Sequence, residues 1–111
     1  MFDNNRWRRL SSIVGIDPAT RAVRTLPVDP AFLRFFTQYM GKHERLDDGT
    51  LQVVVPVEGR VLEFDADGRL LLEINNLFNA DNNAFVADCA LLPPDFFDVP
   101  PERFACAGGR T

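Results

Sequence analysis

Two amides and a guanidinium group lie side by side near the amino terminus. Asn4, Asn5 and Arg6 follow Phe2 and Asp3. The planar fork of arginine matches the oxygens of sulfate, phosphate or carboxylate, and asparagine adds neutral donors beside it. These three residues are our candidates for binding an oxyanion substrate, and Arg6 is also a candidate catalytic residue. The alternative is a turn that carries a surface arginine and binds nothing.

His43 is the one histidine of the chain and the second candidate catalytic residue. A neutral imidazole can act near pH 7 as a nucleophile or as a general base. A zinc site has three or four ligands, and a single histidine cannot build one from histidines. We therefore predict no metal site and no cofactor. The alternative is a structural or exposed histidine.

The acidic clusters are weaker candidates. Glu63, Asp65 and Asp67 superficially resemble a calcium loop, but the twelve-residue spacing with a closing glutamate is absent. We interpret these residues as a hairpin turn. Asp95 and Asp98 flank two phenylalanines that should dock the tail, and we expect both acids to be solvated.

Two cysteines, Cys89 and Cys106, form a disulfide candidate. Closing a loop of about 16 residues would contribute about 3 kcal/mol. An oxidising compartment would favour the bridge, whereas in a cytoplasm both thiols would be packing residues. The sequence leaves both alternatives open.

The composition is that of one ordinary soluble domain. The chain has 111 residues, of which 46% are apolar and 25% charged, and a formal net charge of −4. Negative charge opposes attraction to phosphate backbones, so we predict no nucleic-acid partner. The basic run from Arg6 to Arg9 is interpreted as a solvated or substrate-facing strand end. Neither a membrane span nor a signal peptide is predicted, and the compartment stays unknown.

Two hairpin patterns recur along the chain. Residues 13–23 align without a gap on residues 61–71, with Asp17 on Asp65 and Arg21 on Arg69. A period of roughly 40 to 50 residues that carries strand-turn-strand units is typical of β-propellers. The sequence therefore predicts an all-β fold, a partial β-propeller of about two blades in a single unit over residues 1–111.

The expected strands lie between turn signals. They cover residues 11–16, 21–26, 43–46, 51–55, 60–64 and 69–74, within blade repeats that span residues 1–76. Residues 77–111 should hold a terminal strand over 85–91 and an irregular Pro-rich tail.

One segment departs from the strand pattern. Asp29 can cap a short helix with Pro30 in its first turn, and aromatic residues then recur at helical spacing up to Met40. We therefore predict a short helix before Gly41. Its face should pack on the neighbouring sheet, or alternatively line a pocket, and it consists of Phe32, Phe35, Phe36, Tyr39 and Met40.

Five short motifs follow one another along the chain. They are residues 2–6 (FDNNR), 13–20 (IVGIDPAT), 40–51 (MGKHERLDDGTL), 58–68 (EGRVLEFDADG) and 72–76 (LEINN). In this order they resemble the arylsulfotransferase family. The likeness covers residues 2–76 and, more loosely, the tail through Phe97.

This resemblance implies a six-bladed propeller that transfers a sulfuryl group from a phenolic sulfate ester to a phenol. The transfer passes through a sulfated histidine and uses no nucleotide donor. A neutral imidazole nitrogen attacks sulfur, while arginine and asparagine donors hold the sulfuryl oxygens. Arg6 matches the sulfate-binding arginine of the family.

The family's several active-site histidines have no clear match here. We therefore expect a C-terminal portion that is inactive alone, with another chain as one source of the missing blades. The family would allow a periplasmic or secreted location. Two alternatives stay open: a non-catalytic β-rich binding module that uses the Phe32 to Met40 face, and a small metal-independent enzyme that uses Arg6 with His43.

Overall fold

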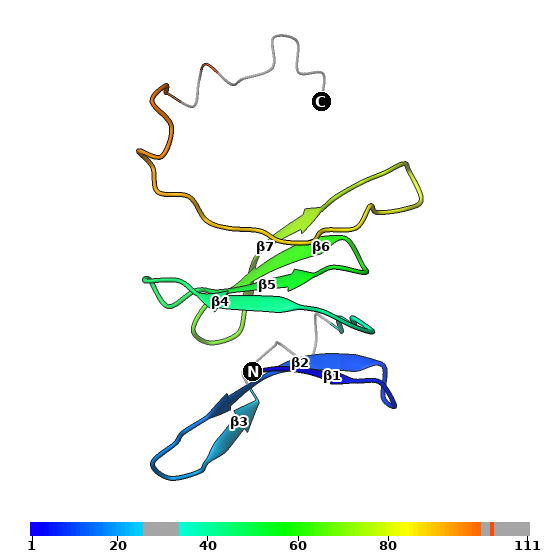
Figure 1. The fold of residues 1–111 in the computed structure, drawn as a ribbon, viewed down its shortest axis with the longest axis vertical. Coiled ribbons are helices and arrows are strands. Elements are labelled where there is room, and N and C mark those ends of the chain that lie inside the picture. Colours follow the sequence, from blue (N-terminus) through cyan, green and yellow to red (C-terminus); the bar gives the residue numbers. More distant parts are fainter. Residues whose placement is uncertain (26–33, 101–102, 104–111) are drawn as a thin grey trace.

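The chain folds into two antiparallel sheets (Figure 1). The structure is a computed structural model that describes residues 1–25, 34–100 and 103. These residues contain strands and no helix, so the predicted all-β class is confirmed. Among the same residues, no helix has the length and apolar character needed to cross a bilayer. The strands are β1 (Phe2–Asn5), β2 (Leu10–Ile16), β3 (Val23–Thr25), β4 (Lys42–Arg45), β5 (Leu51–Val55), β6 (Arg60–Phe64) and β7 (Leu70–Asn75).

The first sheet has the order β1-β2-β3. β1 pairs with the first half of β2, where Phe2 lies opposite Ile13, and β3 pairs with the second half, where Val23 lies opposite Ile16. Beside the first half of β2, where β3 does not reach, the Ser11 N–H donates to the Phe35 carbonyl over 2.9 Å. The connection between the two sheets is thus attached to β2 at Phe35.

The second sheet is a four-stranded meander in the order β4-β5-β6-β7. Val53 at the centre of β5 lies opposite His43 of β4 and Leu62 of β6. A bulge between Glu63 and Phe64 shifts the register with β7. Every residue of β5 is buried, because both faces of this strand are covered.

In both repeated hairpins, β2-β3 and β6-β7, an aspartate side chain accepts backbone N–H groups of the turn. The loop of the first hairpin is one residue longer than that of the second. Asp17 Oδ1 accepts the N–H of Ala19 at 2.8 Å, and Asp65 Oδ1 accepts the N–H groups of Asp67 at 2.9 Å and Arg69 at 2.8 Å. These bonds from aspartate to the backbone are what the turn signals predict.

The gapless alignment is wrong beyond these turns. The Asp17 N–H donates to the Ala22 carbonyl, whereas the Asp65 N–H donates to the Arg69 carbonyl. The first loop is therefore longer by one residue. The left-handed position of the turn is therefore Arg21 (φ 59°) in one hairpin and Gly68 (φ 85°) in the other.

One hydrophobic core lies between the sheets. The connection contributes Phe35, which is 1% exposed, and the ring of Phe2 packs edge-on against it with centroids 5.9 Å apart. The buried core consists of Ile13, Phe35, Leu51, Val53, Val55, Leu62 and Phe64, with Phe2 and Leu70 packed against it. This shared core holds the two sheets as stacked layers (Figure 1).

The predicted short helix is wrong where the structure describes it. Residues 34–40 are irregular, and residues 26–33 lie outside the described part. The Ser11 hydroxyl accepts the Thr37 N–H at 3.0 Å, and Glu58 Oε1 accepts the Phe36 N–H at 3.0 Å. A helix would withdraw these N–H groups from partners that anchor the connection to the sheets.

The predicted strand over residues 85–91 is also wrong. After β7 the chain passes over the β4–β7 sheet on the side away from β1–β3 (Figure 1). A segment lying over a face has no strand edge with which to form a ladder. It is attached instead by single contacts, such as the Val86 N–H to the Pro56 carbonyl at 3.3 Å. The tail through Pro100 is irregular, as predicted.

Candidate functional site

Arg6 lies in a shallow hollow with Arg9, Phe36 and Gln38. The Arg9 guanidinium carbon is 5.9 Å from the centroid of the Phe36 ring, a cation–π arrangement. In the described part of the chain, neither Arg6 nor Arg9 forms an ion pair. The hollow thus combines two positive charges that no described carboxylate pairs with and an aromatic ring, a combination suited to an aromatic anion.

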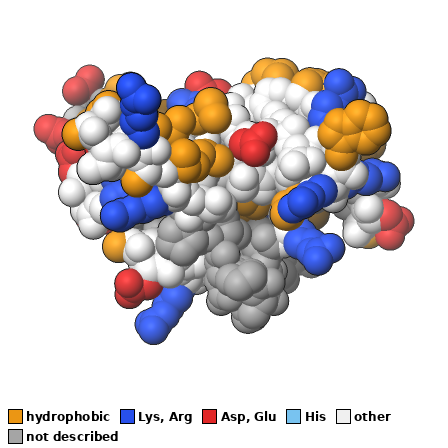
Figure 2. Space-filling model, turned by 90° about the horizontal axis from the view of Figure 1, so that it is seen from below, with side chains coloured by type: hydrophobic (Ala, Val, Ile, Leu, Met, Phe, Trp, Pro, Cys, Tyr) orange, Lys and Arg blue, Asp and Glu red, His pale blue; other side chains and the backbone are white. Residues whose placement is uncertain are grey.

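The turn between β1 and β2 positions these arginines. Asn5 Oδ1 accepts the Arg8 N–H at 3.0 Å, and Arg9 takes a left-handed φ of 49° that returns the chain into β2. Seen from the β1–β3 end, basic and apolar side chains lie together at the side of the molecule where this turn is found (Figure 2). Asn5 therefore shapes the site, since its side-chain oxygen already has a partner.

Asn4 connects the first sheet to the chain that leads into β4. Its Oδ1 accepts the Ser11 hydroxyl at 2.8 Å, and its Nδ2 donates to the Met40 carbonyl at 2.9 Å. Both ends of this amide are engaged within the protein. The structure thus gives Asn4 a positioning contact where the sequence predicted a substrate donor.

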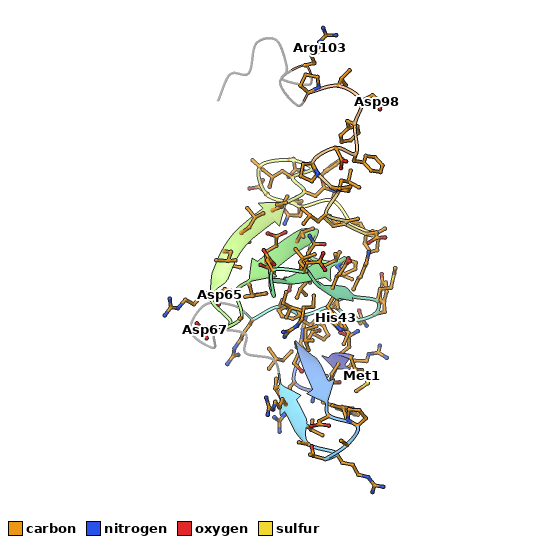
Figure 3. All side chains as sticks on the ribbon, turned by 90° about the vertical axis from the view of Figure 1, so that its left-hand side faces the viewer. Met1, His43, Asp65, Asp67, Asp98 and Arg103 are labelled. Carbon is orange, nitrogen blue, oxygen red and sulfur yellow. The ribbon has the colours of Figure 1, made fainter. Side chains whose placement is uncertain are left out.

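His43 lies at the junction of the two sheets, near the amino terminus (Figure 3). Its ring is half-buried, with its centroid 6.3 Å from that of Phe2. Burial lowers the pKa of His43 below its usual value of 6.5, and the amino-terminal charge lowers this pKa further. The imidazole is therefore neutral at pH 7, as a nucleophile must be.

The structure does not bring His43 and Arg6 together. His43 contacts Phe2, the first residue of β1, whereas Arg6 follows the last residue of that strand. Four residues of extended chain span about 13 Å. The hollow that contains Arg6 is lined by Arg9, Phe36 and Gln38 and not by His43, so the two candidates belong to different places.

The sequence analysis named Arg9 in the basic run and Phe36 in the aromatic face, but it did not bring the two together and it missed Glu58. Glu58 Oε1 holds the Phe36 N–H, while its Oε2 accepts Arg60 Nη1 at 2.9 Å. Arg60 Nε also donates to Glu73 Oε1 of β7 at 3.0 Å. The basic run was a signal for Arg9, but nothing local in the sequence joins residue 36 to residue 9 or to residue 58.

The remaining candidates have no ligand-binding arrangement in the described residues. No group of three or more His, Cys, Asp or Glu side chains there is placed to hold a metal ion. Asp65 closes its hairpin, as interpreted from the sequence. Asp95 and Asp98 are exposed, as expected. Cys89 is half-buried, and Cys106 lies outside the described residues, so the disulfide stays a prediction.

Lys42 and Asp88 form an ion pair that ties the chain after β7 to the sheet. Lys42 Nζ lies 2.6 Å from Asp88 Oδ1. Their hydrogen bond raises the pKa of Lys42 and lowers the pKa of Asp88. Both side chains are well exposed, so the contribution to stability is small.

Comparison with known proteins gives no match: no family model, no curated protein and no solved structure is similar to this chain.

Proposed function

We propose that this chain forms two neighbouring blades of an arylsulfotransferase-like β-propeller and that its Arg6–Arg9 hollow binds the sulfate group of a phenolic sulfate ester. The observation that carries the proposal is the repeated strand order. β1-β2-β3 and β5-β6-β7 are both antiparallel meanders, and their last hairpins close on Asp17 and Asp65. Stacked meanders of this kind are the units of radially repeated sheets.

The hollow supports the oxyanion part of the proposal. Arg6 and Arg9 offer guanidinium donors to sulfate oxygens, and the Phe36 ring offers a surface for the aryl group. Glu58 fixes the backbone of Phe36 from the second sheet. The site therefore depends on the stacking of both sheets.

The chain alone should bind the ester without transferring its sulfuryl group. Transfer needs a nucleophile in line with the sulfur atom, and His43 lies at the other end of β1 from Arg6. In a complete propeller, histidines of other blades would supply the nucleophile, and a phenol would accept the group.

Exposed leucine and isoleucine side chains support a non-catalytic binding module as the second candidate. Leu71, Leu72 and Ile74 of the edge strand β7 are between 44% and 58% exposed. Exposed apolar edges are typical of surfaces that pair with other chains.

An NMR titration with 4-nitrophenyl sulfate tests the binding. We expect saturable shifts of the Arg6 and Arg9 side-chain signals, and about tenfold weaker binding after Arg6→Ala. Arg24→Ala is the matched control, because Arg24 is exposed on β3 and lies away from the hollow. 4-Nitrophenol, which lacks the sulfate, should not shift the arginine signals. Equal affinity of the wild type and Arg6→Ala would refute the proposed site.

Release of 4-nitrophenol in the presence of a phenol acceptor tests the catalytic part. The chain alone should release none above the buffer rate. Release that is lost in His43→Ala would replace the proposal with the small-enzyme alternative.

A further inference from the structure

The turn between β1 and β2 carries an unusually exposed aromatic side chain. Trp7 is 98% exposed, and Arg6, Arg8 and Arg9 around it are exposed as well. In the described residues no carboxylate forms an ion pair with any of these arginines. Tryptophan and arginine are the residues most enriched at the energetic centres of protein interfaces. We call residues 6–9 the Arg-Trp turn.

A segment of opposite character lies near the end of the described chain. Asp95 and Asp98 are exposed, and Phe96 between them is 57% exposed. Residues 93–100 are irregular and lead away from the sheets, with Asp98 far from them in Figure 3. We call residues 93–100 the acidic-aromatic segment.

These two elements lie far apart in one molecule, with the second sheet between them (Figure 1). The Arg-Trp turn belongs to the lower sheet in Figure 1, whereas the acidic-aromatic segment lies above the second sheet. One molecule therefore does not bring its own turn and segment together.

We infer that the acidic-aromatic segment of one copy docks on the Arg-Trp turn of a second copy. Guanidinium groups of the turn would bind the carboxylates of Asp95 and Asp98, and the Trp7 indole would pack on Phe96. Such a contact joins two different surfaces, so it builds rings or chains of copies. The inference goes beyond the proposed function and does not rest on it.

Sedimentation velocity over a concentration series tests the inference. The wild-type chain should self-associate as its concentration rises, and Trp7 emission should shift to shorter wavelength in parallel. Since Trp7 is the one tryptophan of the chain, this shift reports directly on the turn. Arg8→Glu and Asp98→Arg should each weaken association about tenfold, because each change turns an attraction into a repulsion.

A mixture of the two variants gives the decisive result. Glu at position 8 of one copy then faces Arg at position 98 of the other, and the unchanged Arg8 faces the unchanged Asp98. The mixture should regain the association that either variant alone has lost. Both positions are exposed, so neither change disturbs the core.

Arg24→Glu is the control, because it makes the same charge change on β3, outside the turn. Arg8 does not line the Arg6–Arg9 hollow, so sulfate binding is read separately. A wild-type chain that stays monomeric over the whole series would overturn the inference. So would a mixture that stays dissociated, or an equal loss in Arg24→Glu.

Discussion

Replacing Gly59 with alanine should detach the chain that follows β7 from the sheet that it covers. Gly59 has a φ of +63°, and a Cβ there would lie 2.1 Å from the Ala84 carbonyl oxygen and 2.8 Å from the Asn83 Cβ. Neither neighbour is the end of a flexible side chain. The backbone of residues 83–84 must therefore move away.

Gly49, a second glycine with a positive φ, gives the reference for the stability loss expected in Gly59→Ala. Gly49 also has a positive φ, +88°, but a Cβ there meets nothing within 4 Å. Gly49→Ala should therefore cost only backbone strain, about 1 kcal/mol.

Gly59→Ala should cost this strain and the contacts that hold the covering chain. These contacts are Asn83 Nδ2 to the Glu58 carbonyl (2.9 Å), the Ala84 N–H to the Asn76 carbonyl (2.6 Å) and the Val86 N–H to the Pro56 carbonyl (3.3 Å). At about 1 kcal/mol for each hydrogen bond, the total loss is about 4 kcal/mol.

Urea denaturation of both variants measures the difference in the free energy of unfolding. Amide exchange at Ala84 and Val86 should accelerate in Gly59→Ala and stay slow in Gly49→Ala. If the two variants differ by less than about 0.5 kcal/mol, the covering chain is not held as described.

Four further substitutions test the turns and His43. Asp17→Ala and Asp65→Ala should each lower the free energy of unfolding by about 1 kcal/mol in urea, because each removes the acceptor that closes a hairpin; unchanged stability would contradict this. Arg21→Gly should raise the free energy of unfolding by about 0.5 kcal/mol, because Arg21 has a left-handed φ of 59°, which glycine adopts without strain. A decrease in the free energy of unfolding would show that the turn is not left-handed at this position. The folded state lowers the pKa of His43, so the folded state favours the neutral imidazole. The contribution of His43 to stability is therefore complete above the unfolded-state pKa of about 6.5. This contribution is lost as the pH falls from that value through the folded-state pKa. A pH series of denaturation curves should show this loss in the wild type and not in His43→Gln, and identical slopes would count against burial of the ring.

Local sequence patterns predicted the strands from β2 to β7 and the hairpin turns, but they did not predict β1. β5 has the predicted bounds, and β6 does too, because alternation and turn residues act over a few neighbours. The extra residue in the first hairpin escaped the alignment. In that hairpin the left-handed residue is Arg21, where the second hairpin has Gly68, and arginine does not mark that conformation in the sequence.

Contacts between residues distant in sequence explain the errors. The aromatic spacing before Gly41 favoured a helix, but Ser11 and Glu58 hold the backbone of residues 36–37 in an irregular path. Tertiary partners of this kind override local propensity.

The candidate site could be predicted only in part for the same reason. Arg6 was found from its own neighbours, whereas Arg9 meets Phe36 only after the connection folds back on the first sheet.

NOE measurements between the two sheets test most directly whether the repeats stack on one another. The Phe2 ring of β1 should give cross-peaks to the His43 ring of β4, and the Ile13 methyl groups should give cross-peaks to buried side chains of β5 and β6. Cross-peaks confined within each sheet would contradict the stacking, and with it the shared core and the Arg6–Arg9 hollow.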